Sequence, residues 1–69
     1  MADTKFQVEH ESDGFGWIEI TKPLDWWPAI AKLNADNSGR PLRLVEVDAS
    51  GDFLRVVDGS ELIDALLRV

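Results

Sequence analysis

The sequence predicts a small α+β domain with the element order ββαββα, in which two antiparallel hairpins form one four-stranded sheet and two helices pack on it. Short stretches with alternating apolar residues are typical of strands. Two longer stretches carry apolar residues at the spacing of an amphipathic helix. With 69 residues and no cysteine, the chain is long enough for one domain, which a hydrophobic core alone must stabilise.

The pattern of strand, strand and helix occurs twice along the chain, at a shift of 36 residues. The shift matches Phe6 with Leu42, Trp17 with Phe53, and Ile30 with Leu66. We therefore expect a single domain over residues 1–69 with a pseudo-twofold internal repeat, made of units 5–33 and 41–69. The polar start, residues 1–4, is expected to be flexible.

The four predicted strands are short and are joined in pairs by turn-forming residues. They cover residues 5–10, 15–21, 42–48 and 53–57. Asp13-Gly14 separates the first two, and the segment 48–52, rich in Asp, Ser and Gly, separates the last two. Each pair is close enough in sequence to form an antiparallel hairpin.

The first predicted helix begins at Asp25, with Pro28 in its first turn, and ends after Leu33. The second begins at Asp58 or Ser60, where Asp58 and Glu61 are spaced as a variant of the capping box. On a helical wheel, the expected core residues are Trp26, Ala29, Ile30 and Leu33 in the first helix, and Leu62, Ala65, Leu66 and Val69 in the second. Trp27 lies about 100° from Trp26 and is expected at the rim of the core.

Strand periodicity leaves more apolar residues than one layer of helices covers. The set expected to face the helices is Phe6, Val8, Ile18, Ile20, Leu42, Leu44, Leu54 and Val56, and the set expected on the opposite face is Phe15, Trp17, Val45, Val47, Phe53 and Val57. The change of apolar parity between Leu44 and Val45 indicates a β-bulge. Curling of the sheet, one helix on each face, or contact with another molecule would each shield the second set.

The formal charge is −6, from 13 acidic and 7 basic residues. Residues 1–33 carry six acids against three bases and residues 34–69 carry seven against four, so each half has a net charge of −3. Without a basic cluster, neither nucleic acid nor an acidic membrane surface is an expected ligand. No run of about 20 apolar residues and no signal-peptide pattern is present, so we expect a cytoplasmic protein.

The residue types argue against an enzyme, a metal site or a bound cofactor. His10 is the only histidine, and its neighbours Glu9 and Glu11 point to the opposite face of a strand. There is no cysteine or tyrosine, the serines occupy predicted turns and caps, and no glycine-rich phosphate loop is present. A small enzyme that uses His10 is the third hypothesis.

The surplus apolar residues favour a non-catalytic module for protein–protein interaction, with either a different protein or a second copy as its partner. The candidate contact residues are Trp17, Trp27, Val45, Val47 and Phe53. The alternative is an acidic inhibitor that imitates nucleic-acid charge and blocks a basic groove. Its carboxylates would come from the two hairpin tips, at residues 9–13 and 48–52, if the fold brought them together.

Overall fold

The computed structural model describes residues 4–36 and 38–68 and contains the six predicted elements in the predicted order. They are β1 (Lys5–Ser12), β2 (Gly16–Glu19), α1 (Trp26–Ala35), β3 (Leu42–Val47), β4 (Phe53–Val56) and α2 (Gly59–Leu66). The expected flexible start lies outside the described residues except for Thr4, and so does Val69 at the end of the second helical pattern.

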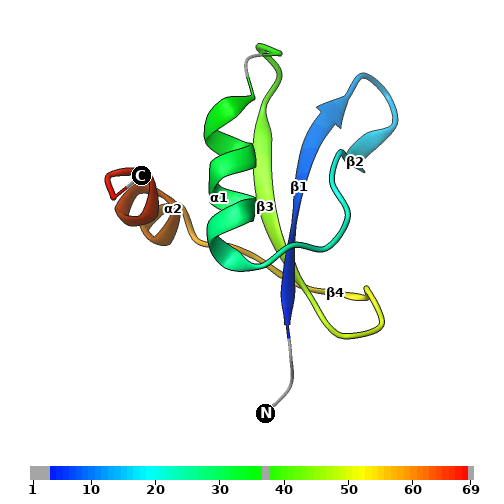
Figure 1. Cartoon of the computed structure of the whole chain (residues 1–69). Coiled ribbons are helices and arrows are strands. Elements are labelled where there is room, and N and C mark those ends of the chain that lie inside the picture. The colour runs from blue at the N-terminus through cyan, green and yellow to red at the C-terminus, as the bar shows by residue number, and fades with distance from the viewer. Residues whose placement is uncertain (1–3, 37, 69) are drawn as a thin grey trace.

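The strands form one antiparallel sheet in the order β2-β1-β3-β4, so β1 and β3 are central and β2 and β4 are the edges (Figure 1). Val8 of β1 lies directly opposite Leu44 of β3. After β2 the chain returns along β1, where Phe6 and Leu24 exchange two backbone hydrogen bonds of 2.8 Å. This return leads the chain directly into α1.

The core lies between α1 and the two central strands. Its buried residues are Val8, Ala29, Ile30, Leu44, Val57 and Ala65. Trp26 packs beside this cluster, edge-to-face against Phe6 with the ring centroids 5.0 Å apart. The helical faces predicted from the sequence are therefore confirmed: Ala29 and Ile30 are buried, whereas Trp27 is 52% exposed at the rim.

The two helices begin at the predicted aspartates, but the two side chains act differently. Asp58 caps α2 and accepts hydrogen bonds from the backbone N–H and the hydroxyl of Ser60. Glu61 does not complete a capping box, because its carboxylate pairs with Arg55 of β4. Asp25 makes no side-chain cap of α1 and forms an ion pair with Lys5.

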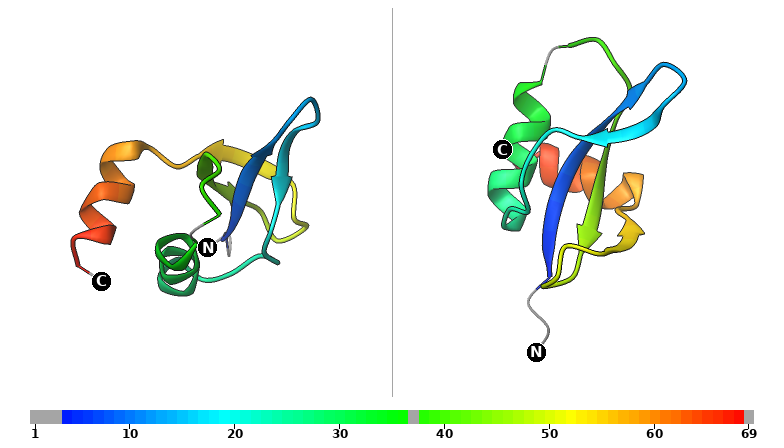
Figure 2. Two further views of the ribbon diagram at one scale, coloured as in Figure 1. Left: turned by 90° about the horizontal axis from the view of Figure 1, so that it is seen from above. Right: turned by 90° about the vertical axis from the view of Figure 1, so that its right-hand side faces the viewer.

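The internal repeat is not confirmed. The order of the strands is symmetric about the β1–β3 pair, but the helices occupy unequal positions. α1 packs across β1 and β3, whereas α2 lies beside α1, away from the strands (Figure 2). The repeat therefore stays a prediction from the sequence.

The β-bulge lies in the second hairpin, and not between Leu44 and Val45 as expected. Val47 is opposite Phe53 but Glu46 is opposite Arg55, so Leu54 is the extra residue. β3 itself alternates regularly, since its apolar residues simply occupy both faces. The prediction for the end of β4 was consequently inverted: Val57 joins the core, and Val56 lies opposite Val45 on the other face.

Candidate protein-binding surfaces

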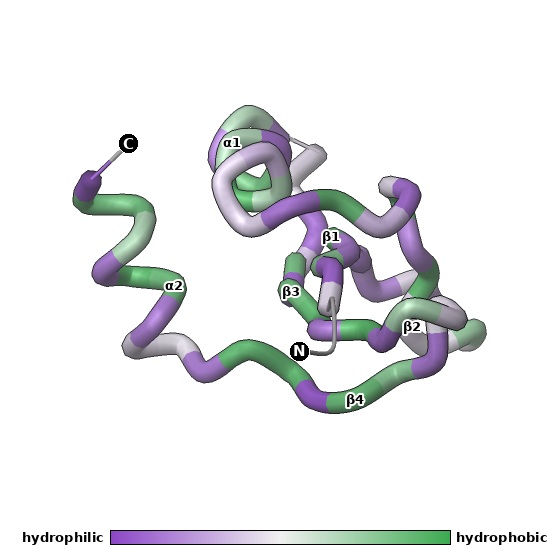
Figure 3. The backbone as a smooth tube through the Cα atoms, turned by 60° about the horizontal axis from the view of Figure 1, so that its bottom comes forward, coloured by the Kyte–Doolittle hydropathy of each residue, from purple (hydrophilic) through white to green (hydrophobic). Residues whose placement is uncertain are grey.

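The face of the sheet opposite α1, which we term the second face, is closed over its centre. The sheet curls away from α1, and its edge strands lie on the far side of the central strands (Figure 3). Val45 and Val47 are consequently only 1% exposed. These two predicted contact residues offer no surface to a partner in this conformation, because the curl encloses them within the chain.

Trp17 also lies on the second face, where it belongs to a polar cluster. The guanidinium of Arg43 lies 4.6 Å from the centroid of the Trp17 ring. The Nε of Arg43 donates a 2.7 Å hydrogen bond to the buried carboxylate of Glu9. Glu9 and Arg43 are direct cross-strand neighbours, which becomes evident only once the register between β1 and β3 is known. The indole is therefore half-buried and has a partner within the chain.

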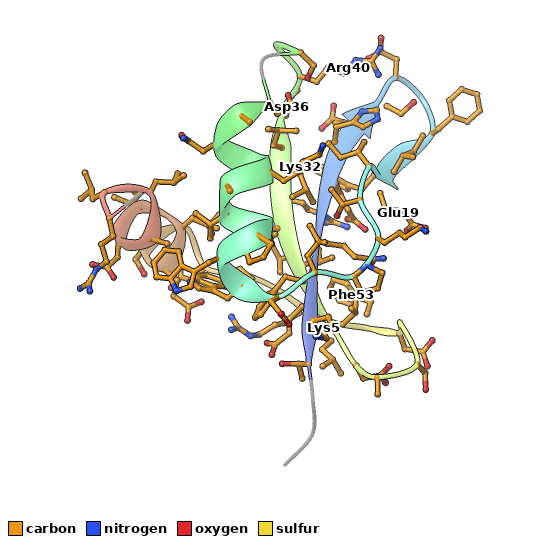
Figure 4. The ribbon with its side chains drawn as sticks, in the orientation of Figure 1. Lys5, Glu19, Lys32, Asp36, Arg40 and Phe53 are labelled. Carbon is orange, nitrogen blue, oxygen red and sulfur yellow. The ribbon has the colours of Figure 1, made fainter. Side chains whose placement is uncertain are left out.

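Phe53 and Trp17 do not form one patch. Trp17 lies opposite Glu11 on β1, whereas Phe53 lies in the row of Val47 and Lys5. These rows are six residues apart along β1, or about 20 Å in an extended strand. Figure 4 shows Phe53 near Lys5, at the end of the sheet opposite Asp36 and Arg40. Trp27 belongs to α1 and therefore lies on the helical side of the molecule.

The edge strand β4 presents exposed apolar side chains close together in sequence. All four of its residues are exposed, and Phe53, Leu54 and Val56 have exposed fractions between 45% and 58%. β4 pairs with β3 on one side only. The Val57 N–H donates a 2.8 Å bond to the Leu44 carbonyl on β3, so strand alternation directs the backbone groups of Val56 to the opposite, free edge. We term Phe53, Leu54 and Val56 the β4 edge surface.

Charged side chains flank this surface and connect β4 to its neighbours. The guanidinium of Arg55 contacts Glu46 at 2.7 Å and Glu61 of α2 at 3.0 Å. These two carboxylates raise the pKa of Arg55 above its usual range, and Glu61 has the larger effect. A hydrogen bond from the Thr4 side chain lowers the pKa of Glu46 below its usual 4.5, and Arg55 lowers it further. Burial of the carboxylate opposes this shift but does not reverse it.

The lowered pKa of Glu46 predicts an acid-dependent loss of stability. A folded-state pKa below the unfolded value adds stability above about pH 4.5, which is lost as the pH falls through the lowered value. In urea titrations, the free energy of unfolding of Glu46→Gln should be below that of the native protein at neutral pH and approach it in acid. Arg55→Gln should keep part of this dependence, because Thr4 remains. Parallel pH profiles for Glu46→Gln and the native protein would contradict the assignment.

The acidic hairpin tips do not come together. Because β1 and β3 are antiparallel, the β1–β2 turn and the β3–β4 turn lie at opposite ends of the sheet (Figure 1). Asp13 therefore lies far from Asp48 and Asp52. An inhibitor that needs both tips side by side gains no support from this arrangement.

His10 lies among polar side chains at the end of β1. Its Nδ1 is 3.4 Å from the Arg40 guanidinium and 3.2 Å from the carbonyl oxygen of Glu11. Within residues 4–36 and 38–68, no group of three or more His, Cys, Asp or Glu side chains is arranged to hold a metal ion. The neighbouring Asp36 accepts hydrogen bonds from the Ser38 backbone and hydroxyl, which lower the pKa of Asp36.

The fold and these surfaces define the protein as a small α+β domain with an exposed apolar sheet edge. Neither a family model, nor a curated protein, nor a solved structure matches the chain. None of the helices in the described part of the chain has the length and apolar character needed to cross a membrane.

Proposed function

We propose that the protein is a non-catalytic interaction module that binds an extended segment of another polypeptide along the free edge of β4. The observation that carries this proposal is that all four residues of the edge strand β4 are exposed, three of them apolar. Such an edge offers unpaired backbone N–H and C=O groups to an added strand. The apolar side chains of the edge can pack against the side chains of that strand. Of the predicted contact residues, Phe53 would contact the partner directly. Val47 and Val45 would not, but they lie opposite Phe53 and Val56 on the neighbouring strand β3.

The partner we propose is a basic segment of a different protein. The net charge of −6 favours a basic partner, and carboxylates flank β4 at Asp52 and Asp58. Two copies of this chain would repel one another. The bulge at Leu54 and the charge of Arg55 are also features that keep identical edges from pairing.

A synthetic octapeptide of alternating lysine and valine tests this function. Added to the ¹⁵N-labelled protein, it should shift the backbone amide resonances of residues 53–56 in a saturable manner. Val56→Pro removes an N–H that points to the free edge, so it should keep the fold and weaken peptide binding about tenfold or more. Phe15→Ser is the matched control, because Phe15 is an exposed apolar residue of the opposite hairpin.

Equal binding by Val56→Pro and the native protein would overturn the edge-pairing proposal. Concentration-dependent dimerisation in sedimentation, lost in Val56→Pro, would instead identify a second copy as the partner. Shifts centred on Trp17, and lost in Trp17→Ser, would move the binding site to the other end of the second face.

A further inference from the structure

A groove runs between the N-terminal turn of α1 and α2, on the opposite side of the molecule from the second face. Its volume is about 290 Å³, and its lining is Trp26, Trp27, Glu61, Asp64, Ala65 and Arg68. Trp26 packs against Phe6 beside the core, whereas Trp27 is about half exposed. The exposed indole is therefore the main apolar group that this groove offers to a ligand.

The other groups that can recognise a ligand in the groove are carboxylates. Glu61 and Asp64 are about half and two-thirds exposed, and each contacts one arginine, at 3.0 Å for Arg55 and 3.3 Å for Arg68. A carboxylate has two oxygens and about four acceptor positions, so each can accept further hydrogen bonds. An aromatic face beside two carboxylates suits a cation, which the ring quadrupole and the negative charges both attract.

The chain already contains this combination once, on the second face. There the guanidinium of Arg43 lies over Trp17 while its Nε bonds to Glu9. The groove contains the corresponding indole, Trp27, and the corresponding carboxylates, Glu61 and Asp64. Its own arginine, Arg68, forms an exposed ion pair with Asp64 on the surface of α2.

We propose that the Trp27 groove binds an arginine side chain of a basic polypeptide, with the guanidinium stacked on the indole and bonded to Asp64 and Glu61. Arginine fits better than lysine because its planar guanidinium stacks on aromatic rings and bonds to carboxylates through two donors at once. This inference goes beyond the pairing of a strand with β4, since it involves a different surface and a side chain instead of a backbone.

The test uses two peptides of nearly the same shape, tetra-arginine and tetra-citrulline, in which the uncharged ureido group of citrulline replaces each guanidinium. The reporter is the indole N–H resonance of Trp27 in ¹H–¹⁵N spectra, with the indole of Trp17 as an internal control. Tetra-arginine should shift the Trp27 resonance in a saturable manner and bind about fivefold or more tightly than tetra-citrulline. High salt should reduce the difference.

Two exposed substitutions should act in opposite directions. Asp64→Asn removes a carboxylate and should weaken the binding of tetra-arginine, whereas Arg68→Gln removes a competing cation and should strengthen it. Equal shifts with both peptides, or weaker binding by Arg68→Gln, would overturn the inference. Because these readouts do not involve β4, they can fail while edge pairing holds, and the converse also applies.

Discussion

Leu44→Ala is expected to remove a large part of the free energy of unfolding and to lower the urea midpoint accordingly. Leu44 is fully buried, lies on the central strand β3, and packs in the only cluster that joins the sheet to both helices among the described residues. Truncating a buried leucine costs about 2–5 kcal/mol, whereas a small domain has a free energy of unfolding of about 5 kcal/mol. Urea titration followed by tryptophan fluorescence and circular dichroism measures the loss.

The matched control is Leu67→Ala, which makes the same chemical change at a side chain that is 81% exposed. Its free energy of unfolding should lie within about 0.5 kcal/mol of the native value. If Leu44→Ala costs less than about 1 kcal/mol, Leu44 does not occupy the centre of the core.

Arg43→Met should cause the second-largest loss of stability, about 2 kcal/mol. The substitution keeps most of the aliphatic length but leaves the buried carboxylate of Glu9 without its 2.7 Å ion pair. It also removes the cation from the face of Trp17. The double variant Glu9→Gln, Arg43→Met should recover part of the loss, since it no longer buries an unpaired charge. A double-mutant cycle in urea measures the coupling energy.

Arg68→Met is the control for this pair, because Arg68 and Asp64 are both about two-thirds exposed. Exposed ion pairs contribute about 0–1 kcal/mol, so this substitution should change stability little. Equal losses in Arg43→Met and Arg68→Met would show that burial does not strengthen the Glu9–Arg43 pair.

Local sequence periodicity determined the elements of this protein and their order. The alternation over residues 5–10 and the three- and four-residue spacing around Ile30 are local properties, because each depends on neighbours within one or two turns or a few strand positions. The same spacing distinguished Trp26, which is partly buried against the core, from the more exposed Trp27 at the rim. Of the surplus apolar residues, Val45 and Val47 are shielded, whereas Phe15 and Phe53 stay exposed.

Only the tertiary structure decided which of the surplus apolar residues are buried and which are exposed. Strand periodicity predicted the same face of the sheet for Val45 and Phe53, yet the curl of the sheet buries the first, while the second lies exposed on an edge strand. The bulge at Leu54, the pairing of Glu9 with Arg43, and the position of α2 beside α1 depend on contacts between residues far apart in the chain. Strand register and sheet curvature arise from the packing of the whole domain, so no local pattern encodes them.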